Sequence, residues 1–277
     1  MPVIDSTEAD RARFCAICRD LLTAKRNGSR GYSEDGEGDH VGLLAEKRMH
    51  AIIKRYICPD VSYHEQKVAE SVPGAKKYVA DILCGDEIYE IQTAGFYPLQ
   101  KKLQWYADNT NYHVTVVHPL AVRRRIVRID PESGVVIPAK RLSPSKKPIS
   151  ILPELVYISE LIAAGRVGVR LLLIDAEEYR LAGVRPRHSR KNESRYEIMP
   201  TDLLGEIMLE LPEDIAELLP ATLPDTFTGT DLAECLRMPS RRAYMALHAL
   251  ENVGVIVCID DGRPKKYTLS GKRLAHI

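Results

Sequence analysis

Residues 78–93 constrain the fold of this chain more than any other segment. Two strand-like stretches, rich in apolar side chains, are separated by only Gly85 and Asp86. A two-residue connection with glycine first is typical of one of the mirror-image turns that close β-hairpins. The residues of the two strands then pair outward from the turn. This register predicts that Asp81 lies directly opposite Glu90.

The predicted register brings two carboxylates together on one face of a sheet. Gln92 shares this face with Glu90, because strand side chains alternate with a period of two. Like charges in opposite positions cost free energy unless a counter-charge or a shared proton is present. Mg²⁺ supplies such a charge and prefers one or two carboxylates with water and substrate phosphates. A solvated sheet face, or a register displaced by one residue, explains the same pattern without a metal.

The spacing also carries a resemblance to a known group of enzymes. Asp81, followed nine positions later by Glu90-x-Gln92, resembles the Asp…Glu-x-Lys signature of the PD-(D/E)XK, or restriction-endonuclease-like, nucleases. In that superfamily the helix before the sheet often supplies another carboxylate, and Glu46 matches it in position. The predicted succession of helix, strand, hairpin, helix and strand over 41–118 is similar to the common core. The segment around Glu90 also resembles a widespread uncharacterised bacterial family with a C-terminal winged helix.

The resemblance implies a metal-dependent DNA endonuclease that uses Mg²⁺ or Mn²⁺. Asp81 and Glu90 would hold the ion, Glu46 would position a second ion or its water, and Gln92 would orient the attacking water. Gln92 departs from the signature, because an amide cannot supply the positive charge of a lysine. The candidates to replace that charge are Lys77, Lys101 and Lys102. The alternative is a non-catalytic DNA-binding regulator with a degenerate nuclease-like core.

The distribution of charge favours a nucleic-acid partner, although the total does not. Lys and Arg number 39 and Asp and Glu number 38, which gives a net charge of +1. The middle of the chain, 119–195, holds 16 basic and 8 acidic side chains, a local charge of +8. Such a segment can bind a polyanion, or it can be a set of solvated loops. The predicted phosphate contacts in it are Arg123, Arg124, Arg125, Lys146 and Lys147.

The sequence predicts an α/β fold with a mixed sheet in a nuclease-like domain over 1–199. A connector of short helical pieces is expected over 200–224, because Pro212 and Pro220 interrupt it. The remaining residues, 225–277, predict two capped helices and a two-stranded hairpin, which resembles a winged helix-turn-helix domain. Its predicted DNA contacts are Arg241, Arg242, Lys265 and Lys266. The C-terminal region as a whole, 196–277, holds 8 basic and 13 acidic side chains, so dimerisation or docking on the core is the alternative role.

Other features bear on the compartment and the assembly. The chain has no apolar run long enough for a membrane span and no signal-peptide pattern, so we expect a cytoplasmic protein without a membrane partner. Its six scattered cysteines are expected to be reduced thiols. The resemblance allows a homodimer, the arrangement in which such nucleases often cut two strands, but the sequence carries no clear assembly signal.

Overall fold

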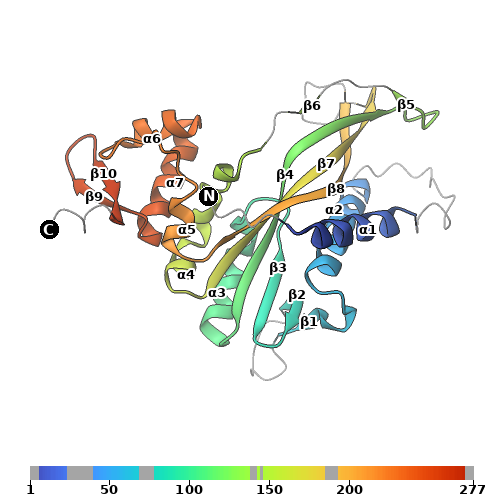
Figure 1. Ribbon diagram of the computed structural model, residues 1–277, viewed down its shortest axis with the longest axis horizontal. Helices are drawn as coiled ribbons and strands as arrows, with labels where there is room; N and C mark the ends of the chain where they lie inside the picture. The colour runs from blue at the N-terminus through green and yellow to red at the C-terminus, as the bar shows by residue number, and fades with distance from the viewer. Residues whose placement is uncertain are drawn as a thin grey trace.

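The computed structural model describes residues 6–23, 40–68, 78–137, 142–143, 146–184 and 193–271 (Figure 1). Its helices are α1 (Glu8–Thr23), α2 (His40–Ile57), α3 (Gln100–Asn109), α4 (Ser159–Ala163), α5 (Pro212–Ala216), α6 (Gly229–Leu236) and α7 (Ser240–Val253). Four 3-10 turns accompany them: η1 (Val61–Tyr63), η2 (Tyr97–Leu99), η3 (Pro148–Ile151) and η4 (Glu154–Tyr157). Its strands are β1 (His64–Lys67), β2 (Val79–Cys84), β3 (Glu87–Ile91), β4 (His113–Ile129), β5 (Val136–Ile137), β6 (Leu142–Ser143), β7 (Val167–Ala182), β8 (Glu193–Leu209), β9 (Ile256–Asp260) and β10 (Lys266–Leu269).

The centre of the molecule is an eight-stranded mixed sheet in the order β1-β2-β3-β4-β7-β8, with β5 and β6 paired to β4. The strands β3, β4 and β7 run parallel, whereas β2 and β8 are antiparallel to their neighbours. The α/β class with a mixed sheet is therefore confirmed. Helix α2 precedes the first strands and α3 connects β3 to β4, which is the succession predicted over 41–118.

The hairpin closes as the sequence predicts. Cys84 pairs with Glu87, and Gly85 has a φ of 60°, a value that glycine adopts without strain. The same register continued places Asp81 opposite Glu90. On its other edge β2 pairs with β1, and the register there places Glu65 opposite Asp81. Three neighbouring strands thus each bring one carboxylate to the same level of the sheet.

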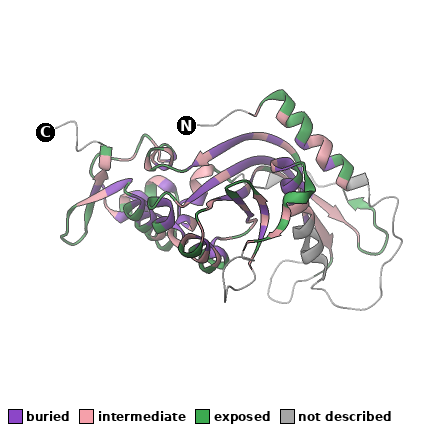
Figure 2. Ribbon diagram, turned by 90° about the horizontal axis from the view of Figure 1, so that it is seen from below, coloured by how far each residue is buried: buried purple, intermediate pink, exposed green. Residues whose placement is uncertain are grey.

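Helices cover both faces of the sheet. One face packs its buried residues against α1 and α2, and the other packs against α3, α4 and the 3-10 turns around them. The long strands and the inward sides of the helices are buried, while the outer side of α1 is exposed (Figure 2). The alternation of β3 follows this division, since Ile88 belongs to the α3 side and Tyr89 and Ile91 belong to the α2 side.

Strand β4 is longer than the sequence predicts. The last strand of the predicted succession, which was expected to end near residue 118, continues without a break to Ile129. Pro119 does not end it, because β3 pairs with β4 only as far as Val117, so the missing N–H of Pro119 removes no bond to β3. At its far end β4 forms a hairpin with β5, in which Arg128 lies opposite Ile137.

The predicted helical connector over 200–224 is wrong in its first part. Residues up to Leu209 belong to β8, and the described helix in this stretch is the short α5. Pro200 is tolerated because it lies at an irregularity in the pairing with β7, and β8 is the last strand of the sheet path. The segment before β7 forms two short pieces, η4 and α4.

The C-terminal elements follow the predicted order of helix, helix and hairpin. Thr228 caps α6 through a reciprocal box with Asp231, and Gly254 ends α7 with a φ of 85°. Strands β9 and β10 pair in antiparallel register. Helix α7 packs against α4 and η4, so its apolar residues share one core with the main sheet. Among the described helices, none has the length and apolar character that crossing a bilayer requires.

Candidate functional site

Asp81 accepts interactions from two other elements. Its Oδ2 accepts a hydrogen bond from the backbone N–H of Ile91 at 2.9 Å. Its Oδ1 lies 3.0 Å from Nζ of Lys54, which belongs to α2 and also reaches Glu65 Oε1 at 3.1 Å. Glu65 holds a φ of 53°, which is unusual for a side chain other than glycine. Lys54 therefore bridges the carboxylates of β1 and β2.

Glu90 is almost fully buried on the α3 side of the sheet. Its side chain is 2% exposed and lies 2.6 Å from Nζ of Lys102. Its other oxygen accepts a hydrogen bond from the hydroxyl of Tyr106 at 3.0 Å. Lys102 and Tyr106 lie one turn apart on α3, so one face of that helix supplies both partners. Lys102 is one of the lysines that the sequence offered in place of the missing charge at Gln92.

Burial sets the protonation of this cluster. Removal from water raises the pKa of Glu90 from 4.5 to about 7, against the lowering effect of Lys102, and the nearby charge of Asp81 raises it further. Burial and the carboxylate of Glu90 together raise the pKa of Tyr106, which remains a hydrogen-bond donor. Asp81 and Glu90 thus lie close enough for one carboxylate to influence the pKa of the other.

Gln92 lies at the end of β3 and helps to shape the following loop. Its side-chain nitrogen donates to the carbonyl of Gly95 at 2.7 Å. Its backbone carbonyl is 2.6 Å from Nδ1 of His118, a buried ring that packs edge-on against Phe96 at 5.5 Å. Burial lowers the pKa of His118 to about 4, so this ring is neutral near pH 7 and Nδ1 donates the bond.

The remaining predicted residues of the site are not part of this cluster or lie outside the described side chains. Glu46 lies in α2, but its side chain falls outside the described part of the chain. Lys77 and residues 185–192 of the basic middle segment also lie outside the described residues. Lys101 is exposed on α3.

Four residues around the pair were not predicted from the sequence: Lys54, Glu65, Tyr106 and His118. The helical spacing of Lys54, four residues after His50 and eight after Glu46, was the available signal. Nothing local marks Glu65, because its place depends on the pairing of β1 with β2.

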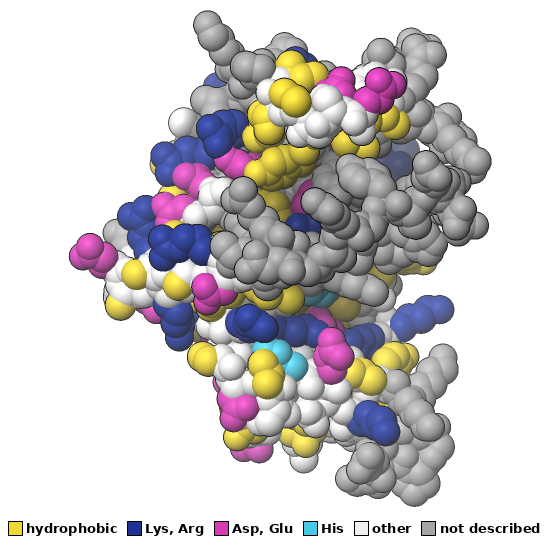
Figure 3. All heavy atoms as spheres, turned by 90° about the vertical axis from the view of Figure 1, so that its right-hand side faces the viewer, with side chains coloured by type: hydrophobic (Ala, Val, Ile, Leu, Met, Phe, Trp, Pro, Cys, Tyr) yellow, Lys and Arg dark blue, Asp and Glu magenta, His cyan; other side chains and the backbone are white. Residues whose placement is uncertain are grey.

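The arginine run on β4 meets an acidic run on β7. Arg123 binds Asp175 through two contacts of 2.7 Å. Arg124 lies 2.8 Å from Glu178, and Arg125 pairs with Glu177. On the described part of the face in Figure 3, Lys and Arg side chains lie among Asp and Glu side chains. The local excess of positive charge is therefore smaller on the surface than in the sequence.

The predicted basic residues of the C-terminal elements are exposed. Arg242 donates to the backbone carbonyl of Ser150 at 3.3 Å and lies 3.8 Å from Glu154, which ties α7 to η3 and η4. On the hairpin, Lys265 and Lys266 have acidic partners of their own, at 2.6 and 3.1 Å. Arg241 precedes Arg242 at the start of α7, and Lys146 and Lys147 are exposed before η3.

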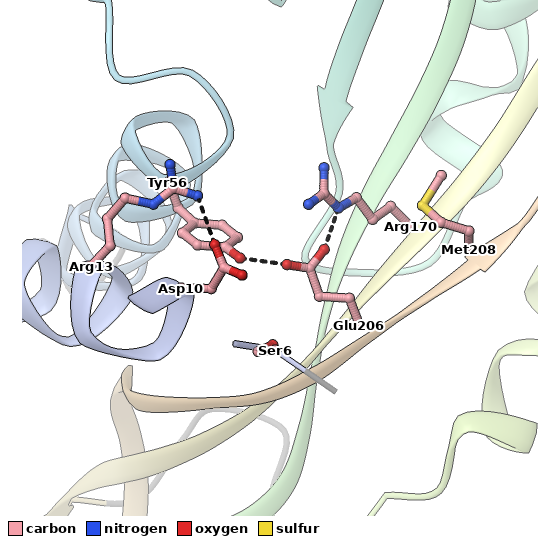
Figure 4. A pocket seen from close by; sticks show the side chains of 7 residues that line it. All are labelled: Ser6, Asp10, Arg13, Tyr56, Arg170, Glu206 and Met208. Carbon is pink, nitrogen blue, oxygen red and sulfur yellow. Dashed lines mark hydrogen bonds and ion pairs between the residues drawn. The ribbon is translucent and has the colours of Figure 1, made fainter. Parts of the chain in front are cut away.

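A cavity of about 290 Å³ lies on the face of the sheet that α1 and α2 cover, opposite to the face that buries Glu90 (Figure 4). The hydroxyl of Tyr56 donates to Glu206 at 2.5 Å, and Arg170 pairs with the same carboxylate. None of the predicted site residues lines this cavity, and its charged groups bind one another. Its lining consists of Ser6, Asp10, Arg13, Tyr56, Arg170, Glu206 and Met208.

Comparison with known proteins gives a family but no activity. The family described as Domain of unknown function (DUF8091) matches residues 47–210, more than half of the chain. The chain belongs to this family. No curated protein and no solved structure matches it. The DUF8091 match contains Lys54, Asp81, Glu90 and Lys102 and ends just after β8, so α6, α7 and the β9–β10 hairpin lie beyond it.

Proposed function

We propose that this chain is a metal-dependent DNA endonuclease whose reactive centre is the Asp81–Glu90 pair. The observation that carries the proposal is that adjacent strands present these two carboxylates at one level, each with a lysine from a different helix as its counter-ion. The need for counter-charge, inferred from the sequence, is met here by Lys54 and Lys102. A cluster of this kind can exchange an ammonium group for another cation.

The donor chemistry suits Mg²⁺ or Mn²⁺. Carboxylate oxygens are the ligands that these ions prefer, and Mg²⁺ needs only one or two of them beside water and substrate phosphates. Within the described side chains, no group of three or more His, Cys, Asp and Glu residues is arranged to hold a metal. Asp81 and Glu90 would hold the ion, with Glu46 as the proposed third carboxylate. When bound, the ion would supply charge stabilisation at the phosphate and activation of water.

The protein side chains would orient the reacting groups. Lys102 and Tyr106 fix both oxygens of Glu90 in place, which limits the rotations of that carboxylate. Lys54, held between Asp81 and Glu65, would offer positive charge to a phosphate oxygen in place of the lysine absent at position 92. The side-chain nitrogen of Gln92 is engaged with Gly95, so its amide oxygen is the atom that would orient the attacking water.

The proposal includes DNA as the partner and the C-terminal elements as a winged-helix DNA-binding module. The order of α6, α7 and the β9–β10 hairpin supports this, as does the exposed position of Arg241 and Arg242 on α7. Phosphate contacts from these residues and from Lys147 would give salt-dependent affinity. A cytoplasmic location and a homodimer complete the proposal.

One observation favours a second function. Both carboxylates are already neutralised by lysines, so the cluster is complete without a metal. A DNA-binding regulator that uses the nuclease-like core as a scaffold would have this arrangement. The two functions differ in one result, because the regulator binds DNA without cutting it.

The test is cleavage of plasmid and single-stranded DNA with Mg²⁺ or Mn²⁺, beside a reaction with chelator. We expect Asp81→Ala and Glu90→Ala to lower the rate by at least about 100-fold, the scale of losing a charged group that stabilises a transition state. Glu87→Ala is the matched control, since it removes an exposed carboxylate from the same strand. Circular dichroism of each variant checks that it is folded. Cleavage that persists unchanged in both site variants would overturn the assignment.

A further inference from the structure

An exposed tyrosine stands beside the candidate site. Tyr97 opens η2, five residues after Gln92, and is 67% exposed, more than any other large apolar side chain of the described residues. Its ring contacts the ring of Tyr157 of η4, with centroids 5.3 Å apart and planes at 65°. The two rings thus form an aromatic step on the surface between the end of β3 and η4.

The backbone under Tyr97 is held firmly. The preceding Phe96 is fully buried, and its N–H donates to Oε2 of Glu154 at 3.3 Å. Gly95 permits this approach, because a Cβ there would lie 2.7 Å from the same oxygen. Pro98 follows and fixes its own φ. The ring is therefore presented to solvent by a rigid segment, and an aromatic surface that is ordered in advance loses little conformational entropy when it binds.

Basic side chains adjoin this aromatic step. Lys147 immediately precedes η3 and is exposed, and η3 leads through two residues to η4, which carries Tyr157. Arg242 of α7 contacts both the Ser150 carbonyl of η3 and Glu154 of η4. Aromatic rings for bases and cations for phosphates therefore lie along one path, from the end of β3 towards α7.

We propose that this surface, formed by Tyr97, Tyr157, Lys147 and Arg242, binds an unpaired stretch of DNA whose bases stack on Tyr97. The inference rests on the proposed function and names its substrate class as single-stranded or partly unpaired DNA. In a duplex each base is covered on both faces by its neighbours, so an exposed ring can stack only on a base that has left the duplex. Single-strand binders combine aromatic platforms and basic grooves in this way.

The experiment measures DNA binding in chelator, so that no cleavage occurs. Fluorescence anisotropy follows a labelled 20-nucleotide oligothymidylate and a labelled duplex of the same length, each with the full-length protein. Tyr97→Leu is expected to weaken single-strand binding about tenfold, the usual scale of one lost stacked base. It should leave duplex binding unchanged. Tyr97→Phe keeps the ring and should bind the single strand as the native protein does.

Two results would contradict the proposed stacking of a base on Tyr97. Native single-strand affinity in Tyr97→Leu, or an equal loss for the single strand and the duplex, would overturn the inference. If that happens while Asp81→Ala abolishes cleavage, the proposed nuclease stands and only its substrate class is wrong. If the native protein cuts nothing but Tyr97→Leu still loses single-strand binding, the binding surface stands and the catalytic proposal fails.

Discussion

Acidic and basic side chains form ion pairs on this sheet in two places, which differ in burial and in the elements that supply the cations. At the candidate site, Asp81 and Glu90 face lysines that come from α2 and α3, and the side chain of Glu90 is 2% exposed. On the extended part of β4 and β7, an arginine ladder pairs neighbouring strands at the surface, where Arg123 and Arg125 are 63% and 65% exposed. The ladder consists of Arg123 and Arg125 with Asp175 and Glu177, whereas the intervening Arg124 pairs with Glu178, whose side chain is only 4% exposed.

The two places differ in how readily another cation could replace the arginine or lysine that is paired with each carboxylate. Arg123 holds both oxygens of Asp175 with a planar fork, and arginine remains charged at all accessible pH values. The lysines at the site are single-point charges on flexible stems, and one of their partners, Glu90, titrates near neutral pH. The ladder is suited to fix strand register, whereas the lysine-neutralised pair is suited to exchange partners. Similar residue types therefore serve structure in one place and, we propose, chemistry in the other.

The largest expected difference between the two places is in stability. Glu90→Ala leaves the buried hydroxyl of Tyr106 without its acceptor and the ammonium of Lys102 without its counter-ion, and should lower the free energy of unfolding by about 1–3 kcal/mol. Asp175→Ala breaks a pair on the surface and should cost less than about 1 kcal/mol. Urea unfolding at pH 7 measures both. Equal losses would show that the two clusters do not differ in the way we describe.

The pH dependence of stability should separate the same two places. The pKa of Glu90 is raised from 4.5 to about 7 by burial, so the folded state holds its proton over a range in which the unfolded state has lost it. Its contribution to stability is complete below pH 4.5 and is lost as the pH rises through about 7. The stability of the native protein relative to Glu90→Gln should therefore fall over that range, by at most about 1.4 kcal/mol per pH unit.

His118 requires a control in that experiment. Its lowered pKa makes stability rise between about pH 4 and 6.5, in the opposite direction. The effect is common to the native protein and Glu90→Gln and cancels in their difference. A difference that stays constant from pH 4.5 to 7 would contradict the assigned titration of Glu90.

The smallest expected effect concerns the salt dependence of DNA binding. Lys147 is exposed beside η3 and lies in the proposed path of the phosphates, so Lys147→Gln should reduce the slope of log affinity against log salt concentration by about 0.7–0.9. Arg123→Gln removes a charge already paired with Asp175 and should leave the slope almost unchanged. Titrations at several salt concentrations measure both slopes. A larger change for Arg123→Gln would assign the ladder, and not the site surface, to DNA.

Turn and helix-capping residues in the sequence predicted the elements that they begin or connect. Gly85 and Asp86 determine the hairpin and its register as far as Ile82 and Tyr89, because the register of a tight hairpin is fixed by its turn, and Asp81 and Glu90 are the next residues along it. Thr228 and Asp231 likewise predict the start of α6.

Long-range pairing accounts for what the sequence did not predict. Strand β8 escaped prediction because Pro200 suggests a break unless the irregular pairing with β7 is known. The partners of the arginine ladder are 52 or more residues distant and are selected by the pairing of β4 with β7. Lys54 reaches Asp81 only because α2 packs on the sheet. These features depend on tertiary register, which no local pattern specifies.

Binding of Mn²⁺ tests most directly whether the carboxylate pair, and not the ladder, holds a divalent cation. Electron paramagnetic resonance counts bound Mn²⁺ during a titration of the native protein, Asp81→Asn and the matched variant Asp175→Asn. We predict that the native protein and Asp175→Asn bind Mn²⁺ alike and that Asp81→Asn loses the site. Identical titrations of all three proteins would contradict the account.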